Sequence, residues 1–123
     1  ELEKEIQAKG ANVAPRITPA DIEANITSEF YFTAADGVRG VSVGKFGESL
    51  IAEYVTYEGS PLFLQTFCVL VLRNGFTVTG ESAFASPANF DAELGRKIAR
   101  YNAVAKIWPL MGYELRSKLA SRE

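Results

Sequence analysis

The sequence predicts a single α+β domain, residues 1–123, in which a mainly antiparallel sheet is packed by one long helix. Asn74-Gly75 separates two strand-like runs, residues 62–73 and 76–84, and this dipeptide is the strongest short-range signal of a β-hairpin. Further on, large apolar residues recur at spacings of three and four, which indicates an amphipathic helix over 88–108. We therefore expect the hairpin at the centre of the sheet and helical segments at both ends of the chain.

The N-terminal 17 residues are predicted to form a short helix and a linker. ELEKEIQAK (1–9) is helix-prone, and Gly10 is well placed to end that helix. A helix this short is marginal alone in water, so we expect it to pack on something else, such as a neighbouring subunit. A second short helix is predicted to begin at Thr18, with Thr18 as its N-cap and Pro19 in the first helical position.

The middle of the chain carries weaker signals. Residues 28–37 are predicted to form a strand or a helix-to-strand passage. The glycine-punctuated stretch 37–48 is similar to a phosphate-binding loop, but Gly44-Lys45 is followed by Phe46 rather than by Ser or Thr. We therefore predict a mobile loop or an irregular strand there. Residues 50–57 are predicted to form a strand.

The hairpin fixes a register and an orientation. A two-residue turn of type I′ at Asn74-Gly75 predicts three cross-strand pairs: Val71 with Val78, Leu70 with Thr79, and Cys68 with Glu81. The first strand is apolar on both faces, so we expect it to be central in the sheet and covered on both sides. The second strand alternates, and its polar face is predicted to meet either solvent or a pocket.

The long helix is predicted to turn one apolar stripe toward the sheet: Phe90, Leu94, Ile98, Tyr101, Ala105 and Trp108. Pro109 is expected to end this helix, because the residue before a proline is disfavoured in the helical conformation. A final amphipathic segment, residues 110–120, is predicted to turn Tyr113, Leu115 and Leu119 toward the core or a partner.

The composition argues against catalysis. The chain has no histidine, which removes the commonest general base, the commonest metal ligand and every Ser-His or Cys-His arrangement. No metal-ligand spacing occurs either. We therefore predict no catalytic residue, no metal site, no cofactor and no enzymatic activity.

The composition also limits the partners. The net charge of −2 argues against binding to a DNA or RNA polymer. No apolar run approaches the roughly 20 residues that cross a bilayer, so no membrane partner is expected. Cys68 is the single cysteine and lies in an apolar run, where it is predicted to be a core residue. One cysteine and no signal peptide are typical of a cytoplasmic protein.

Small and hydroxyl residues occur where the second hairpin strand meets the long helix, in GESAFASPANFD (80–91). The first turn of a helix offers unpaired N–H groups and a partial positive charge, which favour an anion. The candidate ligand-binding residues at this junction are Ser82, Phe84, Ser86, Asn89 and Asp91. Asp91 could accept hydrogen bonds from ribose hydroxyls, and Phe84 could stack on a base. The same residues also fit helix capping and core packing, so both interpretations stay open.

A nucleotide at this junction needs cations from elsewhere. Arg96 and Arg100 lie two to three turns along the polar face of the same helix and are not expected to reach back to its start. The cations would then come from another segment, at Arg16, Arg39, Lys45 or Lys106, or from a second subunit. This requirement favours a pocket at the interface of a homo-oligomer, a dimer or larger.

The stretch TFCVLVLRNGFTVTGESAFASPANFDAELGRKIARYNAVAKIWPLMGYEL, with SEFYFTAADG before it, resembles a family of small proteins encoded by tailed phages and prophages. The resemblance covers residues 20–115. It extends to phage anti-Thoeris proteins, which are oligomeric sponges that bind cyclic ADP-ribose isomers and withhold them from a host defence effector. The resemblance also implies that some members hold cyclic oligonucleotides at a separate site.

The resemblance implies roles for several residues. Asn89 and Asp91 fall in the nucleotide pocket, with Phe84 and Lys106 as further members, although Phe84 stands where a small residue such as cysteine is expected. Arg16 and Thr18 would form a second anionic site.

The implied function is a phage anti-defence protein that sequesters a cyclic ADP-ribose isomer, without cleaving it, in the host bacterial cytoplasm. The alternatives are a sponge for cyclic oligonucleotides, a module that blocks a host protein through its C-terminal helices, and an enzyme that degrades such a signal.

Overall fold

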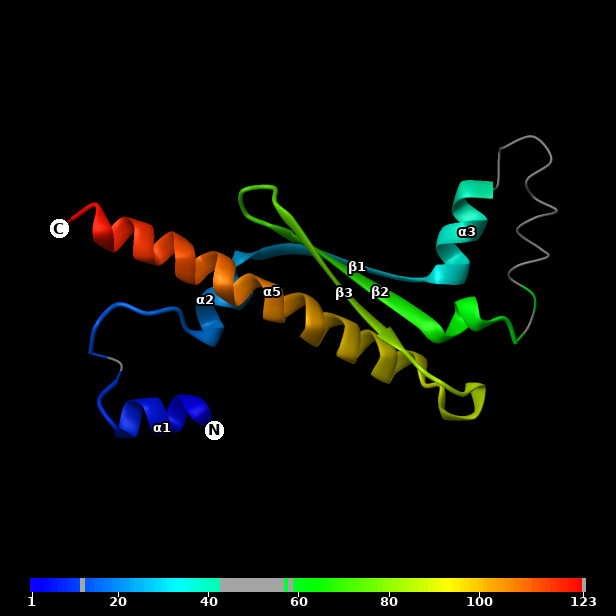
Figure 1. Cartoon of the computed structure of the whole chain (residues 1–123), viewed down its shortest axis with the longest axis horizontal. Helices are drawn as coiled ribbons and strands as arrows, with labels where there is room; N and C mark the ends of the chain where they lie inside the picture. The colour runs from blue at the N-terminus through cyan, green and yellow to red at the C-terminus, as the bar shows by residue number, and fades with distance from the viewer. Residues whose placement is uncertain (12, 43–56, 58, 123) are drawn as a thin grey trace.

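The computed structural model describes residues 1–11, 13–42, 57 and 59–122, and its fold is the predicted α+β class (Figure 1). A three-stranded antiparallel sheet is packed by a long C-terminal helix, with helical segments at both ends of the chain. The elements in chain order are α1 (Leu2–Ala8), α2 (Pro19–Asn25), β1 (Ile26–Thr33), α3 (Ala34–Ser42), the 3-10 helix η1 (Pro61–Leu64), β2 (Gln65–Leu72), β3 (Thr77–Ala83), the 3-10 helix η2 (Pro87–Asn89) and α5 (Ala92–Ala120).

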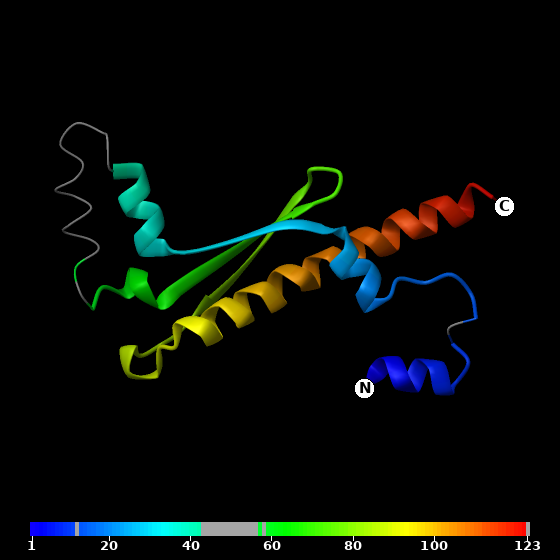
Figure 2. The ribbon, with the colours of Figure 1, turned by 180° about the vertical axis from the view of Figure 1, so that it is seen from behind.

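The strand order is β1-β2-β3, so β2 is central, as predicted. One face of β2, with Thr66, Cys68, Leu70 and Leu72, is buried. Its other face, which includes Phe67 and Val69, is only half-buried in the part of the chain that the structure describes. The prediction that both faces are covered is therefore wrong for these residues. α5 covers one face of the sheet, and the views from front and back show it on a single side (Figures 1 and 2).

The hairpin occurs where Asn74-Gly75 predicts it, but its loop is longer. The Leu72 N–H donates to the Phe76 carbonyl over 2.8 Å, so three residues, 73–75, form the loop. Gly75 has a φ of 89°, whereas Asn74 does not have the positive φ that a type I′ turn requires. The predicted register is wrong by one residue, and the pairs are Val71 with Thr77, Leu70 with Val78, and Cys68 with Gly80.

α5 is one continuous helix of 29 residues with Pro109 inside it, so the predicted end at this proline is wrong. Proline removes one helical hydrogen bond and costs about 3 kcal/mol inside a helix. The residues after it, such as Leu110 and Met111, are strong helix formers, and Met111 also packs against the core. The helix begins at Ala92 rather than at residue 88, because residues 87–89 form η2 and Asp91 caps the helix.

The face of α5 that contacts the sheet is made mostly of small residues, which differs from the prediction. Its buried residues are Gly95, Ala99, Ala103 and Ile107. A Cβ at Gly80 of β3 would lie 2.1 Å from the Ala99 carbonyl oxygen, so the backbones of strand and helix are in direct contact. The predicted stripe through Leu94, Ile98, Tyr101 and Trp108 points away from the core and is exposed.

The N-terminal elements follow the sequence closely. α1 forms but has no buried residue. Thr18 and Asp21 form a reciprocal capping box at the start of α2, whose Ile22 enters the core. Residues 28–33 of the predicted stretch 28–37 form a strand, in β1, whereas residues 34–37 lie in α3, so the prediction is wrong for them.

Residues 37–42 lie in α3, so the prediction of a loop or strand is wrong for them. Residues 43–56, which include most of the strand predicted at 50–57, lie outside the described residues. The part of the chain that the structure describes contains no helix long and apolar enough to cross a membrane.

Candidate functional site

The junction between β3 and α5 brings together five of the predicted site residues, and three of them have local structural roles. The buried Ser82 hydroxyl donates to the Gly95 carbonyl over 2.7 Å, which ties the end of β3 to the first turn of α5. Ser86 accepts from the Ala88 N–H at the start of η2, and Asp91 accepts from the Leu94 N–H over 3.0 Å as the N-cap of α5. The capping interpretation of Ser86 and Asp91 is therefore correct, and one Asp91 oxygen is left over.

Phe84 is held as a wall of the junction. Its ring meets that of Phe90 edge to face, with the centroids 5.5 Å apart. Its backbone N–H donates to the Leu64 carbonyl, and its ring lies against Gly95, where an added Cβ would be 3.5 Å away. This residue is half-buried, so only part of its ring is open to a ligand.

Asn89 is the most available polar group of the junction. It is exposed, and its side-chain amide makes no hydrogen bond within the described residues. Its backbone N–H donates to the Ser86 carbonyl, which holds the residue in η2 beside the start of α5. Asn89 therefore presents both an N–H₂ donor and a carbonyl acceptor to a ligand.

The other two predicted residues lie elsewhere in the chain. Lys106 is on α5, 15 residues beyond Asp91, which corresponds to about 22 Å along a helix. Its Nζ lies 3.5 Å from the Thr79 hydroxyl. Arg16 pairs with Glu3 of α1, with its guanidinium nitrogen 2.5 Å from the carboxylate oxygen. One chain therefore does not bring either cation to the junction.

Of the two arginines expected not to reach the start of α5, Arg96 does lie near it. It lines a hollow of about 100 Å³ together with Phe90, Ala92 and Asp36. That volume is well below the 300–1,000 Å³ of typical small-molecule sites, so this hollow does not hold a nucleotide by itself.

Arg100 is engaged in a separate cluster. It pairs with Glu23 over 2.8 Å and with Glu29 over 3.2 Å. The hydrogen bond from Arg100 lowers the pKa of Glu23; hydrogen bonds from Tyr31 and then Arg100 lower that of Glu29. The same cluster raises the pKa of Tyr31, through burial and its bond to Glu29.

Cys68 is fully buried, as the sequence predicts, and burial raises the pKa of its thiol. A raised pKa keeps the sulfur protonated and unreactive. Among the residues that the structure describes, no group of three or more Asp, Glu or Cys side chains is arranged to hold a metal ion.

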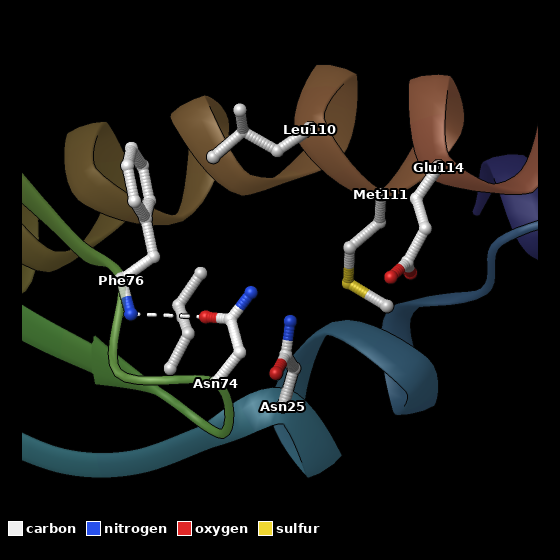
Figure 3. A pocket seen from close by; sticks show the side chains of 7 residues that line it. Asn25, Asn74, Phe76, Leu110, Met111 and Glu114 are labelled. Carbon is white, nitrogen blue, oxygen red and sulfur yellow. Dashed lines mark hydrogen bonds between the residues drawn. The ribbon is translucent and has the colours of Figure 1, made fainter. Parts of the chain in front are cut away.

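A second cavity, which the sequence did not predict, lies at the other end of β3 (Figure 3). We call it the hairpin pocket. It has a volume of about 240 Å³ and is lined by Asn25, Leu72, Asn74, Phe76, Leu110, Met111 and Glu114. These residues come from α2, the hairpin and α5, and no local pattern in the sequence relates three such distant segments.

These features define a small α+β protein with a polar strand-to-helix junction and a separate pocket at its hairpin. Residues 17–119 match the sequence model of the phage protein (N4 Gp49/phage Sf6 gene 66) family, and the chain belongs to this family. The resemblance to a phage protein family is thereby confirmed at this level. No curated protein and no solved structure gives a significant match.

Proposed function

We propose that this protein is a phage anti-defence protein that binds and sequesters a cyclic ADP-ribose isomer in the host cytoplasm without cleaving it. Membership of a phage protein family supports the setting, and the resemblance of its residues to anti-Thoeris proteins supports the ligand class. The observation that carries the proposal is the outer face of α5, which provides the means to complete the junction with a second copy.

The outer face of α5 is defined by four large apolar residues that stay exposed: Leu94 (46%), Ile98 (39%), Tyr101 (76%) and Trp108 (37%). They lie opposite the small residues that contact the sheet. A continuous apolar stripe of this kind on a soluble protein marks a surface for another macromolecule. α1, which has no buried residue, lies beside Trp108 at one end of this stripe.

Antiparallel pairing of two α5 helices would cover this stripe. Tyr101 is near the middle of the stripe, so a two-fold axis there places residue 101 + n of one copy level with residue 101 − n of the other. Residue 106 of the second copy is then level with residue 96 of the first, which shortens the separation of about 22 Å along the helix between Lys106 and Asp91 within one chain. The Lys106 side chain extends toward Thr79 of its own β3, so it must turn away from that contact to reach the junction of the other copy.

In the completed site, each group has a distinct role. Lys106 of the second copy and Arg96 pair with the phosphates, because charge-assisted hydrogen bonds are the strong ones. Asn89 and the free oxygen of Asp91 bind base and ribose, and the rings of Phe84 and Phe90 close the apolar side. The chain contains no histidine, so these roles are binding roles.

The test is a release assay. The purified protein is mixed with cyclic ADP-ribose isomers and cyclic oligonucleotides, separated from unbound material and heated, and the released ligand is identified by mass spectrometry. We expect an intact cyclic ADP-ribose isomer. An empty heated fraction contradicts the proposal, and a cleaved product contradicts the absence of catalysis.

The site assignment is tested with a double variant, Asn89→Ala with Asp91→Ser. Serine keeps the N-cap of α5 but removes the carboxylate, so the fold is preserved. We expect this variant and Lys106→Gln to release no nucleotide. Lys4→Gln, on the exposed surface of α1, is the matched control and should release as much as the wild type.

A second candidate function is a module that blocks a host protein. It is favoured by the sheet face opposite α5, where Phe30 and Phe32 of β1 are exposed and Phe67 is half-buried. Pairing through α5 leaves this face uncovered. Under this alternative the release assay is empty, and a host protein captured by the wild type is lost with Phe30→Ser but kept with Ile98→Ser.

A further inference from the structure

We propose that the hairpin pocket is a second ligand site, separate from the junction, and that it takes a purine base. It is bounded by the end of α2, the hairpin loop and the second half of α5. β3 separates it from the junction, and a strand of seven residues spans about 23 Å. Its volume of about 240 Å³ is smaller than the sites that hold whole drug-sized ligands, which suits a single base.

The two asparagines of the pocket present donors and not acceptors. The Asn25 Oδ1 accepts from the Arg73 N–H over 3.1 Å, and the Asn74 Oδ1 accepts from the Phe76 N–H over 2.9 Å. Because each carbonyl oxygen is held by a backbone N–H, the amide orientations are fixed. Figure 3 shows both amide nitrogens directed into the space between the hairpin and α5. The floor of the pocket is therefore a pair of preorganised N–H₂ donors.

The apolar walls fit a flat ring. Phe76 follows the loop and is 55% exposed, so its ring is available for stacking. Leu110, from the facing turn of α5, is also exposed, and Met111 lies beside it (Figure 3). Stacking on an aromatic ring accepts any base, because every base has a π face.

Glu114 supplies an acceptor. Its carboxylate points toward the pocket in Figure 3, and its ion pair with Lys118 is long, at 3.9 Å, and exposed. Two donors and one acceptor match a purine edge, where ring nitrogens or a carbonyl accept and an exocyclic amine or ring N–H donates. A carboxylate at this position disfavours a phosphate, so the pocket recognises the base and not the anion.

Association through the outer face of α5 leaves this pocket accessible. Its α5 residues Leu110, Met111 and Glu114 lie on the side of the helix that faces the hairpin and α2. The proposed purine site therefore does not depend on the junction or on the oligomer.

The probes are adenosine and guanosine, with ribose 5-phosphate as the control that carries sugar and phosphate but no base. Binding is followed by ligand-observed NMR on the full chain. A nucleoside bound through its base alone is expected to have a Kd on the order of 0.1–1 mM. Such a ligand is lost during the removal of unbound material, so it does not interfere with the release assay.

The decisive variants are Asn25→Asp and Asn74→Asp. Aspartate keeps the oxygen that accepts from the backbone N–H and replaces the N–H₂ donor with an acceptor, so the fold is retained and the polarity is reversed. We expect each to weaken nucleoside binding by about tenfold or more, and Phe76→Ala to do the same. Asn89→Asp at the junction is the matched control and should bind nucleosides as the wild type does.

The two sites are distinguished by this design. Asn89→Ala with Asp91→Ser should abolish nucleotide release but keep nucleoside binding, and Asn74→Asp should do the reverse. Absence of binding by both nucleosides to the wild type, or binding that Asn74→Asp and Phe76→Ala leave unchanged, would overturn the hairpin site without affecting the junction.

Discussion

The two faces of α5 differ in the size of their side chains and in what covers them. The inner face has glycine and alanine at three of its four buried positions, and it lies directly on the sheet. The outer face carries leucine, isoleucine, tyrosine and tryptophan, and it remains exposed. The larger apolar surface of the helix is thus on the side away from its own core.

The size of apolar residues therefore does not by itself identify the core face of a helix. The contact with Gly80 brings the helix so close to β3 that only small residues fit between them. In the proposed assembly the large apolar residues on the other side contact a second copy. On this account α5 lies between its own sheet and a second copy of the chain.

The largest expected effect on stability comes from Gly80→Ala, because the added methyl group would push the inner face of α5 away from the sheet. The new Cβ would lie 2.1 Å from the Ala99 oxygen and 2.3 Å from the Ala103 nitrogen, and these backbone atoms cannot rotate away. We expect the free energy of unfolding to fall by about 4 kcal/mol or more, measured by urea titration. Thr77→Ala, at an exposed site of the same strand, should cost less than about 1 kcal/mol. Equal costs for the two would contradict the close contact.

The next effect compares two isoleucines on opposite faces. Ile107 is fully buried, so Ile107→Ala should cost about 3 kcal/mol at every protein concentration. Ile98→Ala should cost less than about 1 kcal/mol in the monomer. Its effect should grow with protein concentration, because association adds stability only above the dissociation constant. Thermal melts of both variants over a series of protein concentrations measure the two costs. A cost of Ile98→Ala that does not change with protein concentration would argue against association through the outer face of α5.

A smaller effect is expected at the flank between the two faces, where Arg100 pairs with Glu23 and Glu29. Both carboxylates are about half exposed, so solvent screens the pairs and Arg100→Gln should cost about 1 kcal/mol at pH 7.

The pKa values of Glu23 and Glu29 are held below their usual range, so this contribution is present above about pH 4.3 and is lost as the pH falls through the lowered values. Unfolding of wild type and Arg100→Gln should therefore differ at pH 7 and coincide near pH 2. A difference that persists in acid would show that Arg100 contributes mainly through packing.

The smallest effect is a gain in stability. Gly112 lies in the helix interior, and no atom is within 4 Å of the position of an added Cβ. Gly112→Ala should therefore stabilise by about 0.5–1 kcal/mol through helix propensity. Gly95→Ala, where the Cβ would lie 3.2 Å from the Thr66 hydroxyl, should gain nothing or destabilise. Melting temperatures of the two variants check this prediction: Gly112→Ala should raise the melting temperature, and Gly95→Ala should leave it unchanged or lower it.

The fold class was predictable because its signals are local. Asn74-Gly75 located the hairpin, Thr18 and Pro19 located α2, and the strand-like runs on either side of Asn74-Gly75 located β2 and β3. The errors arose where non-local packing decides. The hairpin loop has three residues rather than two, so the predicted register was wrong by one residue. The close contact at Gly80 requires small residues on α5, so the buried face of the helix is the one opposite to the predicted face. Pro109 did not end the helix because strong helix formers follow it.

The candidate site was predictable only in part. The sequence placed Ser82, Phe84, Ser86, Asn89 and Asp91 together because they are neighbours in the chain. It also predicted that the cations must come from elsewhere, and the structure places Lys106 and Arg16 away from the junction. The hairpin pocket could not be predicted, since Asn25, Asn74 and Glu114 meet only through the tertiary fold.

The most direct test of the central claim is the mass of the protein in solution, measured by sedimentation equilibrium for the wild type and for Ile98→Asp. The claim is that a second copy across the outer face of α5 completes the nucleotide site. It predicts a wild-type mass that is a multiple of 13.4 kDa, and a folded 13.4 kDa variant that no longer retains a cyclic ADP-ribose isomer. A wild type that sediments at 13.4 kDa and still retains the nucleotide would contradict it.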